Sequence, residues 1–468
     1  MSTDSHLCPD SEAASLPMRC VASSWWPLAL SWLLMAAEGP ALSAVVARLV
    51  DPEVNLAAFG VVYSIALIIE SPIIMLLSAS TALSKDWDSY RKLHRFMMWL
   101  SAGLTALHVL IAFTPLYDVL IVGLIRPPVE IVEPTRLGVM VMLPWTWAIA
   151  YRRFQQGVLI RFGHSRAVSL GTAVRLGTDA TVMIGGYLLA TRAGMAAGIT
   201  GVVVASTALA ASTTAEAIYA GLRVRPVLRR QVRSAAPVDE PLTAPEFLRF
   251  YTPLAMTSLL ALVVQPVGSA ALSRMPQALE SLAVWPVLSG FVFLLRSAGM
   301  AYNEVVIALL DEPRSTRSLR RFAYLLAAVV TALLLITAAT PLAPLWFRRV
   351  SGLKAHLATL AHRGLWLALP WPALNVFYSW YQGAVVHSRR TRPVTEAVVI
   401  YLLTSSAILW SGVAWGQIAG LHVGVVAFAA GAVAQTLWLW HRSRGAVQAV
   451  EARDEAAAVI RASDIAAP

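Results

Sequence analysis

The 468-residue chain is 57% hydrophobic and only 13% charged, with a mean hydropathy of +0.65. These values lie far outside the range of soluble globular domains and indicate a multi-pass membrane protein that packs in lipid. The net charge of +11 does not indicate nucleic-acid binding, because most of the excess lies in short loops between apolar segments, where it sets topology.

A window of about 20 residues predicts twelve membrane-spanning helices. In chain order they run near 22–46, 54–82, 96–116, 136–160, 167–190, 195–221, 248–272, 279–310, 322–346, 360–386, 394–414 and 418–440. Basic residues concentrate in the even-numbered loops, with one basic odd-numbered loop around Arg348, Arg349 and Lys354. The positive-inside rule therefore predicts that both termini lie in the cytoplasm.

The second half of the chain repeats the first at a fixed shift of 226 residues without a gap. The shift pairs Pro40 with Pro266, Thr114-Pro115-Leu116 with Thr340-Pro341-Leu342, Leu143-Pro144-Trp145 with Leu369-Pro370-Trp371, and Gln156-Gly157 with Gln382-Gly383. Apolar composition would scatter Leu and Ala matches, but would not repeat Pro, Gln-Gly and Thr-Pro-Leu at one offset. We therefore predict an all-α membrane fold of two parallel six-helix repeats, related by an axis along the membrane normal.

The repeat and the charge pattern predict five segments. A cytoplasmic leader covers 1–21, and a first six-helix bundle covers 22–222. A polar cytoplasmic linker at 223–246 leads to the second bundle at 247–441, and a cytoplasmic tail follows at 442–468.

Matched prolines lie inside the first span of each half. Pro40 and Pro266 each remove one helix hydrogen bond and kink the axis, so they are either gating hinges or plain helix-shaping residues. Glu38 and Gln265 stand beside them, close to the carbonyl groups that a kink frees. Glu38 is accordingly a candidate site for a coupling proton, with a merely hydrogen-bonded carboxyl as the alternative.

Charged residues inside membrane spans are functional candidates, because each costs roughly 2.5–3.5 kcal/mol at the bilayer centre. The shift of 226 places Glu70 opposite Arg296, so equivalent helices carry opposite charges. If they face one another, an ion pair would close a central cavity in one state; a static pair or separate local partners are the alternatives. Asn303 and Glu304 would add polar lining further along the same helix.

Further charges occur in the fourth and fifth spans. Arg152 and Arg153 would either reach the interface by snorkelling or attract anions into the cavity. Arg175 and Asp179 are four residues apart and share a helix face, which predicts mutual neutralisation. Since no nucleotide-binding loop, metal-binding motif or catalytic elbow occurs, we predict no enzymatic activity, catalytic residue, metal or cofactor.

Several of these segments carry a family resemblance. FQQGVLIRFGHSR (154–166) and WYQGAVVHSRRTR (380–392), within two six-helix repeats, resemble the MOP flippase superfamily, which includes the MATE exporters and lipid-linked saccharide flippases. LAAFGVVYSIALIIESPI (56–73), SKD (84–86) and WWPLA (25–29) look most like the progressive ankylosis branch. The resemblance implies alternating access, with the first, second, seventh and eighth helices around a central cavity. It places Glu38, Glu70, Gln265 and Arg296 near the pathway, and Glu38 is the only first-helix carboxylate comparable to that of proton-coupled MATE exporters.

The leading hypothesis is a secondary transporter of the cell membrane that exports a small solute. The ankylosis resemblance implies an anion such as pyrophosphate, nucleotide or citrate, for which Arg296, Arg152 and Arg153 are candidate attractors. The alternatives are a cation-coupled MATE-type drug exporter, a lipid-linked saccharide flippase and a non-transporting scaffold. The expected partners are the lipid bilayer, a small-molecule substrate and a coupling proton or sodium ion, without nucleic acid.

Overall fold

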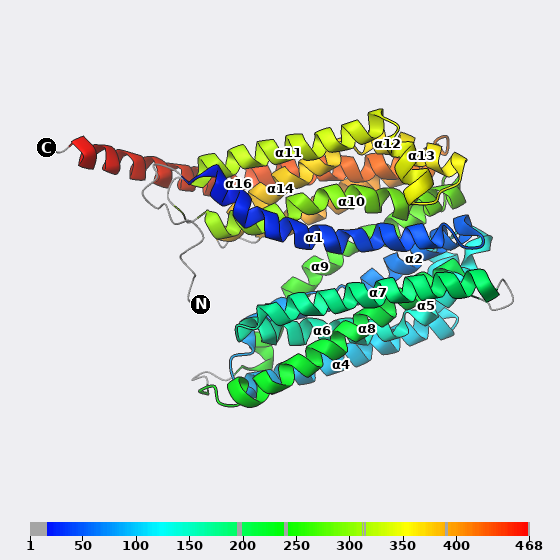
Figure 1. Cartoon of the computed structure of the whole chain (residues 1–468), viewed down its shortest axis with the longest axis horizontal. Coiled ribbons are helices and arrows are strands. Elements are labelled where there is room, and N and C mark those ends of the chain that lie inside the picture. Colours follow the sequence, from blue (N-terminus) through cyan, green and yellow to red (C-terminus); the bar gives the residue numbers. More distant parts are fainter. Residues whose placement is uncertain are drawn as a thin grey trace. The chain divides into compact units, whose positions relative to one another are not determined.

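The computed structural model of the chain describes residues 16–193, 199–237, 242–310, 312, 315–388 and 392–466. The predicted leader, linker and tail fall partly outside these residues. The described chain is helical throughout, with no strand in the ranges given, which confirms the all-helical fold prediction (Figure 1).

The helices follow one another with short connections. In chain order they are α1 (Met18–Val46), α2 (Pro52–Glu70), α3 (Leu76–Leu83), α4 (Trp87–Phe113), the π-helical turn η1 (Asp118–Ile125), η2 (Val129–Ile131), α5 (Val132–Val141), α6 (Leu143–Arg161), α7 (Ser165–Ala193), α8 (Gly201–Val227), η4 (Leu228–Val232), α9 (Ala244–Leu272), α10 (Ala278–Leu309), α11 (Ser315–Ala339), α12 (Leu342–Pro344), the π-helical turn η5 (Leu345–Val350), α13 (Ala355–Leu367), α14 (Pro370–His387), α15 (Arg392–Trp415) and α16 (Gly420–Ala466).

Nine helices in the described part of the chain are long and apolar enough to cross a membrane. They are α1, α2, α4, α8 with η4, α9, α10, α11, α15 and α16. The other three predicted spans fall on the pair α5–α6, on α7 and on the pair α13–α14. The count of twelve therefore stays a prediction.

Three spans predicted as continuous are broken, which corrects the boundaries of 54–82, 136–160 and 360–386. Pro72 follows the end of α2, while Pro144 and Pro370 stand in the first turn of α6 and α14. A proline fits the first turn of a helix, where no N–H is needed, but cannot extend a preceding helix without losing a hydrogen bond. The repeated Leu-Pro-Trp motif thus marks the same helix junction in both halves.

The chain divides into two compact units that alternate along the sequence. Unit 1 holds residues 1–41, 287–411 and 421–468, and unit 2 holds 42–286 and 412–420. In unit 2, α4, α6, α7 and α8 run alongside one another; in unit 1, α11 and α14 are neighbours, and α16 continues beyond the other helices of its unit (Figure 1). Whether 22–222 and 247–441 act as two bundles stays a prediction.

The sequence repeat has a direct counterpart in the hydrogen bonds of the two units. In unit 1, Trp25 Nε1 on α1 donates to the carbonyl oxygen of Ala298 on α10, at 3.0 Å. In unit 2, Tyr251 on α9 donates through its hydroxyl to the carbonyl oxygen of Pro72. A shift of 226 converts residue 25 into 251 and residue 72 into 298. In each unit, therefore, the first predicted span of one half binds the second predicted span of the other half.

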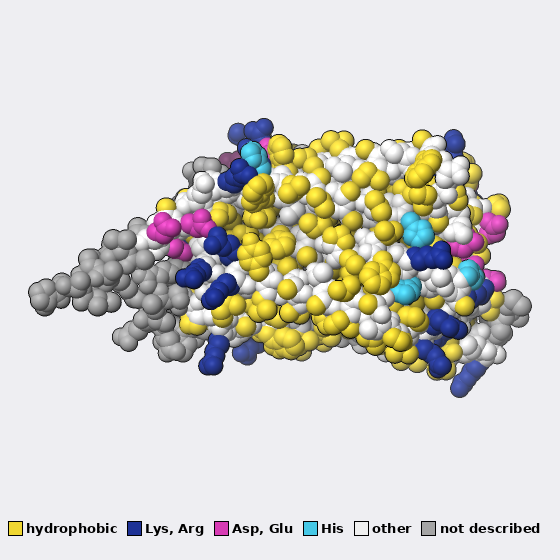
Figure 2. All heavy atoms as spheres, turned by 90° about the horizontal axis from the view of Figure 1, so that it is seen from above, with side chains coloured by type: hydrophobic (Ala, Val, Ile, Leu, Met, Phe, Trp, Pro, Cys, Tyr) yellow, Lys and Arg dark blue, Asp and Glu magenta, His cyan; other side chains and the backbone are white. Residues whose placement is uncertain are grey.

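The outward-facing side chains fit a lipid environment. Trp99, Tyr324 and Leu403 are 74%, 60% and 63% exposed on candidate spans. On the face shown in Figure 2, hydrophobic side chains cover the middle, and Lys, Arg, Asp and Glu gather toward its two ends. Exposed apolar surface of this extent needs lipid or a partner to cover it.

Candidate functional site

A buried carboxylate on α8, Glu216, connects three helices of unit 2. Its Oε2 accepts a hydrogen bond from Nη1 of Arg152 on α6, and its Oε1 accepts from Nε2 of Gln156 at 2.9 Å. Arg175 on α7 lies 3.6 Å away, measured from Nε to Oε2. The side chains of Glu216, Arg152 and Arg175 are only 1%, 9% and 11% exposed. One acceptor thus compensates two buried cations.

Small residues let the helices that carry this cluster approach closely. A Cβ on Gly157 of α6 would lie 1.7 Å from Oγ of Ser80 on α3, and one on Gly171 of α7 would lie 3.4 Å from Cγ of Glu216. The first copy of the Gln-Gly motif therefore has two separate roles. Gln156 binds the buried carboxylate, and the following glycine makes room for α3.

Glu70, the last residue of α2, lies in the same unit. It is 5% exposed, and its Oε2 has no hydrogen-bond partner among the described residues. Within this unit, the carboxylate of Glu70 is attracted electrostatically by the guanidinium groups of Arg153 and Arg152 on α6. Unit 2 therefore brings together Glu70, Arg152 and Arg153, which the sequence predicted separately as pathway residues.

Arg296 on α10 has different surroundings in unit 1. Its guanidinium lies over the indole of Trp371, 4.9 Å from the ring centroid. The phenol of Tyr401 also interacts electrostatically with this guanidinium. Its buried Nε has no hydrogen-bond acceptor in the described ranges. No described carboxylate of its own unit forms an ion pair with Arg296. Within its unit, this cation is held by the face of the Trp371 ring rather than by an opposite charge.

The other predicted residues of unit 1 are bound to neighbouring helices. Asn303 Nδ2 donates to the Ser379 carbonyl at 3.0 Å, which ties α10 to α14. Glu304 is exposed and accepts from Trp32 Nε1 at 2.9 Å, which ties α10 to α1. Glu38 is half-buried on α1. These contacts fix α10 between its neighbours, and a role in a pathway stays a prediction for each residue.

The prolines differ in their positions relative to the units. Pro40 lies inside α1, next to the point where the chain passes from unit 1 to unit 2, and its ring packs against Gly290 of α10. Pro266 lies inside α9, within unit 2, next to the half-buried Gln265. Pro286, which the sequence reading did not single out, stands inside α10 at the next crossing between units.

Sequence reasoning missed Glu216 and the role of Gln156. The available signal was a lone carboxylate inside the predicted span 195–221. It is the same type of signal that selected Glu70, but the shift of 226 places Glu216 opposite Arg442, beyond the last predicted span, so the repeat offers no matched residue for it. Arg152 pairs with Glu216 and does not snorkel to an interface.

These features define a class of protein: a helical membrane protein with an internal repeat and buried charges inside its bundles. No family model matches the chain, and no curated protein matches it. Solved structures do match in fold. An inward-facing multidrug resistance MATE family transporter of the MOP superfamily aligns over 92% of this chain and 99% of its own, with a TM-score of 0.68 and 14% identity.

Two further structures extend the likeness. The lipid II flippase MurJ, in an inward closed conformation, covers 93% of this chain and 91% of its own, with a TM-score of 0.68 and 13% identity. A MOP superfamily transporter from Pyrococcus furiosus, described with a binding pocket of reverse polarity, covers 94% and 98% with a TM-score of 0.62 and 16% identity. At these identities the likeness establishes the fold, which is that of MATE and MOP transporters.

Proposed function

We propose that the protein is a membrane secondary transporter that moves a small solute by alternating access. The observation that carries this proposal is the fold likeness over almost the whole length to MATE and MurJ transporters. The repeat supports it, because two similar arrangements of one duplicated unit are the usual basis of alternating access. The predicted cell-membrane location, cytoplasmic termini and absence of enzymatic activity belong to the same proposal.

The substrate class that we propose is an organic or phosphate-type anion, as in the progressive ankylosis branch. The support comes from the contrast between the two units. Arg152 and Arg175 of unit 2 are compensated by Glu216, whereas Arg296 of unit 1 lies over the Trp371 ring and has no carboxylate partner within its described unit. A half-buried cation without a counter-ion in its unit carries a desolvation cost, and a bound anion would reduce that cost.

In this proposal the predicted residues have unequal weight. Arg296 is the main substrate contact, and Arg153 a secondary one. Arg152 contributes less, because Glu216 already neutralises it. Glu38, Glu70, Gln265, Asn303 and Glu304 remain proposed pathway residues, and Pro40 and Pro266 remain proposed hinges.

A cation-coupled drug exporter is the second candidate. Glu70 favours it, since a buried carboxylate with an unbonded oxygen is a suitable acceptor for a coupling proton or sodium ion. Several structural neighbours are also multidrug MATE transporters. The likeness to MurJ keeps a lipid-linked saccharide flippase as the third candidate.

Uptake into proteoliposomes separates these candidates. The purified full-length protein is assayed with labelled pyrophosphate, ATP and citrate and with a cationic dye, each with and without a proton gradient. We expect anion uptake that is lost in Arg296→Gln and retained in the matched surface variant Arg320→Gln, whose arginine pairs with Glu451 at 2.8 Å. Dye movement that requires a proton gradient and Glu70, with all three anions inert, would replace the anion proposal with a drug exporter.

A further inference from the structure

Five arginines lie within eleven residues at the end of α8, on η4 and at the C-cap of η4. They are Arg223, Arg225, Arg229, Arg230 and Arg233, and all five are exposed. They open the predicted polar linker at 223–246, on the side of the membrane that the positive-inside rule assigns to the cytoplasm. The first four of these residues are called the arginine cluster below.

Only the fifth arginine has a visible structural role. Arg233 lies over the ring of Trp87, with its guanidinium carbon 4.4 Å from the ring centroid, and so holds the end of η4 against the start of α4. Two other cations near the start of α4 are also used inside the protein, since Arg91 and Lys92 lie 3.3 and 2.7 Å from the carboxylate of Asp88. The side chains of the arginine cluster form no hydrogen bond, ion pair or ring contact within the part of the chain that the structure describes.

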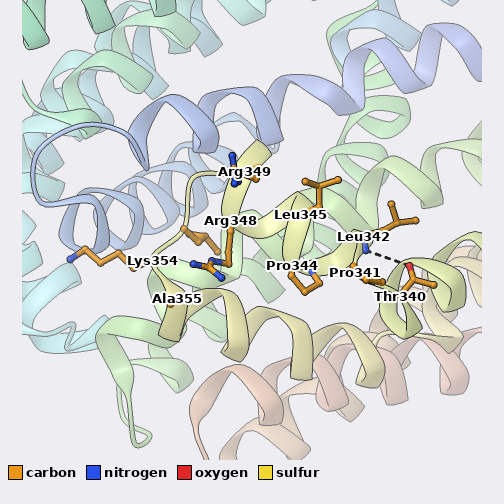
Figure 3. Close-up of a pocket in the computed structure, with 10 residues that line it drawn as sticks. Thr340, Pro341, Leu342, Pro344, Leu345, Arg348, Arg349, Lys354 and Ala355 are labelled. Atoms are coloured by element: carbon orange, nitrogen blue, oxygen red, sulfur yellow. Dashed lines mark hydrogen bonds between the residues drawn. The ribbon is translucent and has the colours of Figure 1, made fainter.

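A second basic segment, in unit 1, offers a contrast. Arg348, Arg349 and Lys354 border a hollow of about 850 Å³ beyond the end of α11. Figure 3 shows the side chains of Arg349 and Lys354 directed away from this hollow, and both residues interact with other groups of the chain. The protein itself therefore accounts for these two cations, whereas it does not account for the arginine cluster.

The duplicated copy of this segment shows that the fold does not need positive charge here. The shift of 226 pairs the arginine cluster with Ala449, Glu451, Glu455 and Ala456 of α16. The chain is helical at all four positions in both copies, although two arginines of the first copy correspond to glutamates in the second. A function that requires positive charge at this end of unit 2 explains the difference.

The arginine cluster lies where α8 leaves the hydrocarbon layer. α8 and η4 form one candidate span of 32 residues, which is about 48 Å long at about 1.5 Å per residue. The hydrocarbon core is about 30 Å thick, so roughly 15 Å of this helix extends beyond it even with a tilt of about 20°. The polar, arginine-rich end is the part that can do so.

The face of α8 that contacts lipid continues directly into the cluster. Ile218 and Leu222 are 59% and 52% exposed, and Arg225 and Arg229 follow them on the same helix face at intervals of three and four residues. This face therefore changes from aliphatic to cationic at the level of the headgroups. Long basic side chains at such a level keep their stems along apolar surface and their charges among polar groups.

We propose that the arginine cluster binds the phosphate groups of acidic phospholipids in the leaflet at this end of α8. Arg225 and Arg229 contact the headgroups of lipids whose acyl chains lie along Ile218 and Leu222. Basic residues clustered directly beyond a membrane helix are attracted by the negative surface potential of such a leaflet. The positive-inside rule explains why cations occur on this side, but not why these lack partners within the described chain and continue its lipid-facing stripe. The proposal does not depend on which solute the protein moves.

The test counts bound lipids by native mass spectrometry. The purified full-length protein is delipidated in detergent and titrated with equal amounts of phosphatidylglycerol and phosphatidylcholine. With roughly a five-fold contribution from each cation near the membrane surface, Arg225→Gln combined with Arg229→Gln is expected to weaken the tightest phosphatidylglycerol site about 30-fold. The matched control Arg91→Gln combined with Lys92→Gln also removes two cations, but these pair with Asp88, so binding should weaken less than about five-fold. Equal weakening in both double variants overturns the proposal, because it would reflect net charge alone.

Two further arms use the wild-type protein and need no variant to fold. In one arm the salt concentration is raised, and the preference for phosphatidylglycerol should fall as screening increases. A preference that is insensitive to salt overturns the proposal. In the other arm inorganic pyrophosphate or a short single-stranded RNA competes with phosphatidylglycerol at matched ionic strength, and neither should displace it. Displacement by pyrophosphate would assign the arginine cluster to a soluble phosphate, and displacement by RNA would assign it to nucleic acid; either result overturns the lipid assignment.

Discussion

Removal of the Glu216 carboxylate is the sharpest test of the buried cluster in unit 2. Glu216→Ala deletes the acceptors of Arg152 Nη1 and Gln156 Nε2 and the ion-pair partner of Arg175. Two buried cations then lose this opposite charge. Hydrogen bonds to charged groups contribute about 1.5–3 kcal/mol each, and loss of one partner of a buried ion pair costs about 3–5 kcal/mol.

This loss predicts a large fall in thermal stability. For a unit of this size, 1 kcal/mol corresponds to about 2–4 °C, so the expected decrease in Tm is about 6–20 °C. The assay is a melting curve of the purified protein in one detergent, followed by size-exclusion chromatography. The double variant Glu216→Ala with Arg152→Ala should lose less than the sum of the single variants, because both residues belong to one network.

A carboxylate at the surface provides the control. Glu396 binds Arg442 at 2.9 Å and Arg392 at 3.2 Å, but its side chain is 25% exposed. Exposed ion pairs contribute about 0–1 kcal/mol, so Glu396→Gln should lower Tm by less than about 4 °C. Equal decreases in Tm for Glu216→Ala and Glu396→Gln would refute the reasoning about the cluster. So would a decrease in the double variant that equals the sum of the decreases in the Glu216→Ala and Arg152→Ala variants.

Two further predictions concern packing and capping. Gly157→Ala places a methyl group 1.7 Å from Ser80 Oγ and 2.5 Å from the backbone oxygen of Leu77. We therefore expect the free energy of unfolding, measured in melting experiments, to fall by about 1–3 kcal/mol. The control Gly103→Ala, whose added Cβ would meet no neighbouring atom within 4 Å, should be neutral or stabilising. Asp454 Oδ2 accepts from the Thr316 backbone N–H at 3.1 Å and from its hydroxyl at 2.6 Å, and so caps the start of α11. Asp454→Ala should cost about 0.5–2 kcal/mol, with Asp454→Asn less affected; an equal loss in both variants would contradict the capping role.

The helical class and the duplication could be predicted from the sequence because both depend on local composition and on identity at one offset. The breaks within three of the predicted spans could not be predicted in this way. Prolines lie at helix ends at positions 72, 144 and 370, yet Pro40 and Pro266 lie inside continuous helices. Hydropathy averaged over a window does not separate these cases, because the cost of a proline depends on what satisfies the freed carbonyl group.

The charged cluster around Glu216 could be predicted from the sequence only in part, for a related reason. The rule for residues four apart on a helix selected Arg175 with Asp179, but it detects only neighbours on one helix. Glu216 is 64 residues from Arg152 and contacts it because α6 and α8 pack together. The exchange of first helices between units, seen in the bonds of Trp25 and Tyr251, likewise depends on packing that no sequence period encodes.

Trans-stimulation tests the central claim of alternating access most directly. Proteoliposomes that contain the purified protein are preloaded with an unlabelled anion that supports uptake, and the entry of the labelled anion is compared with entry into empty vesicles. The account predicts faster entry into preloaded vesicles, because a carrier returns faster with substrate bound, and it predicts no stimulation for Arg296→Gln. Equal entry rates with and without preloaded anion, or uptake that grows without saturation, would contradict it.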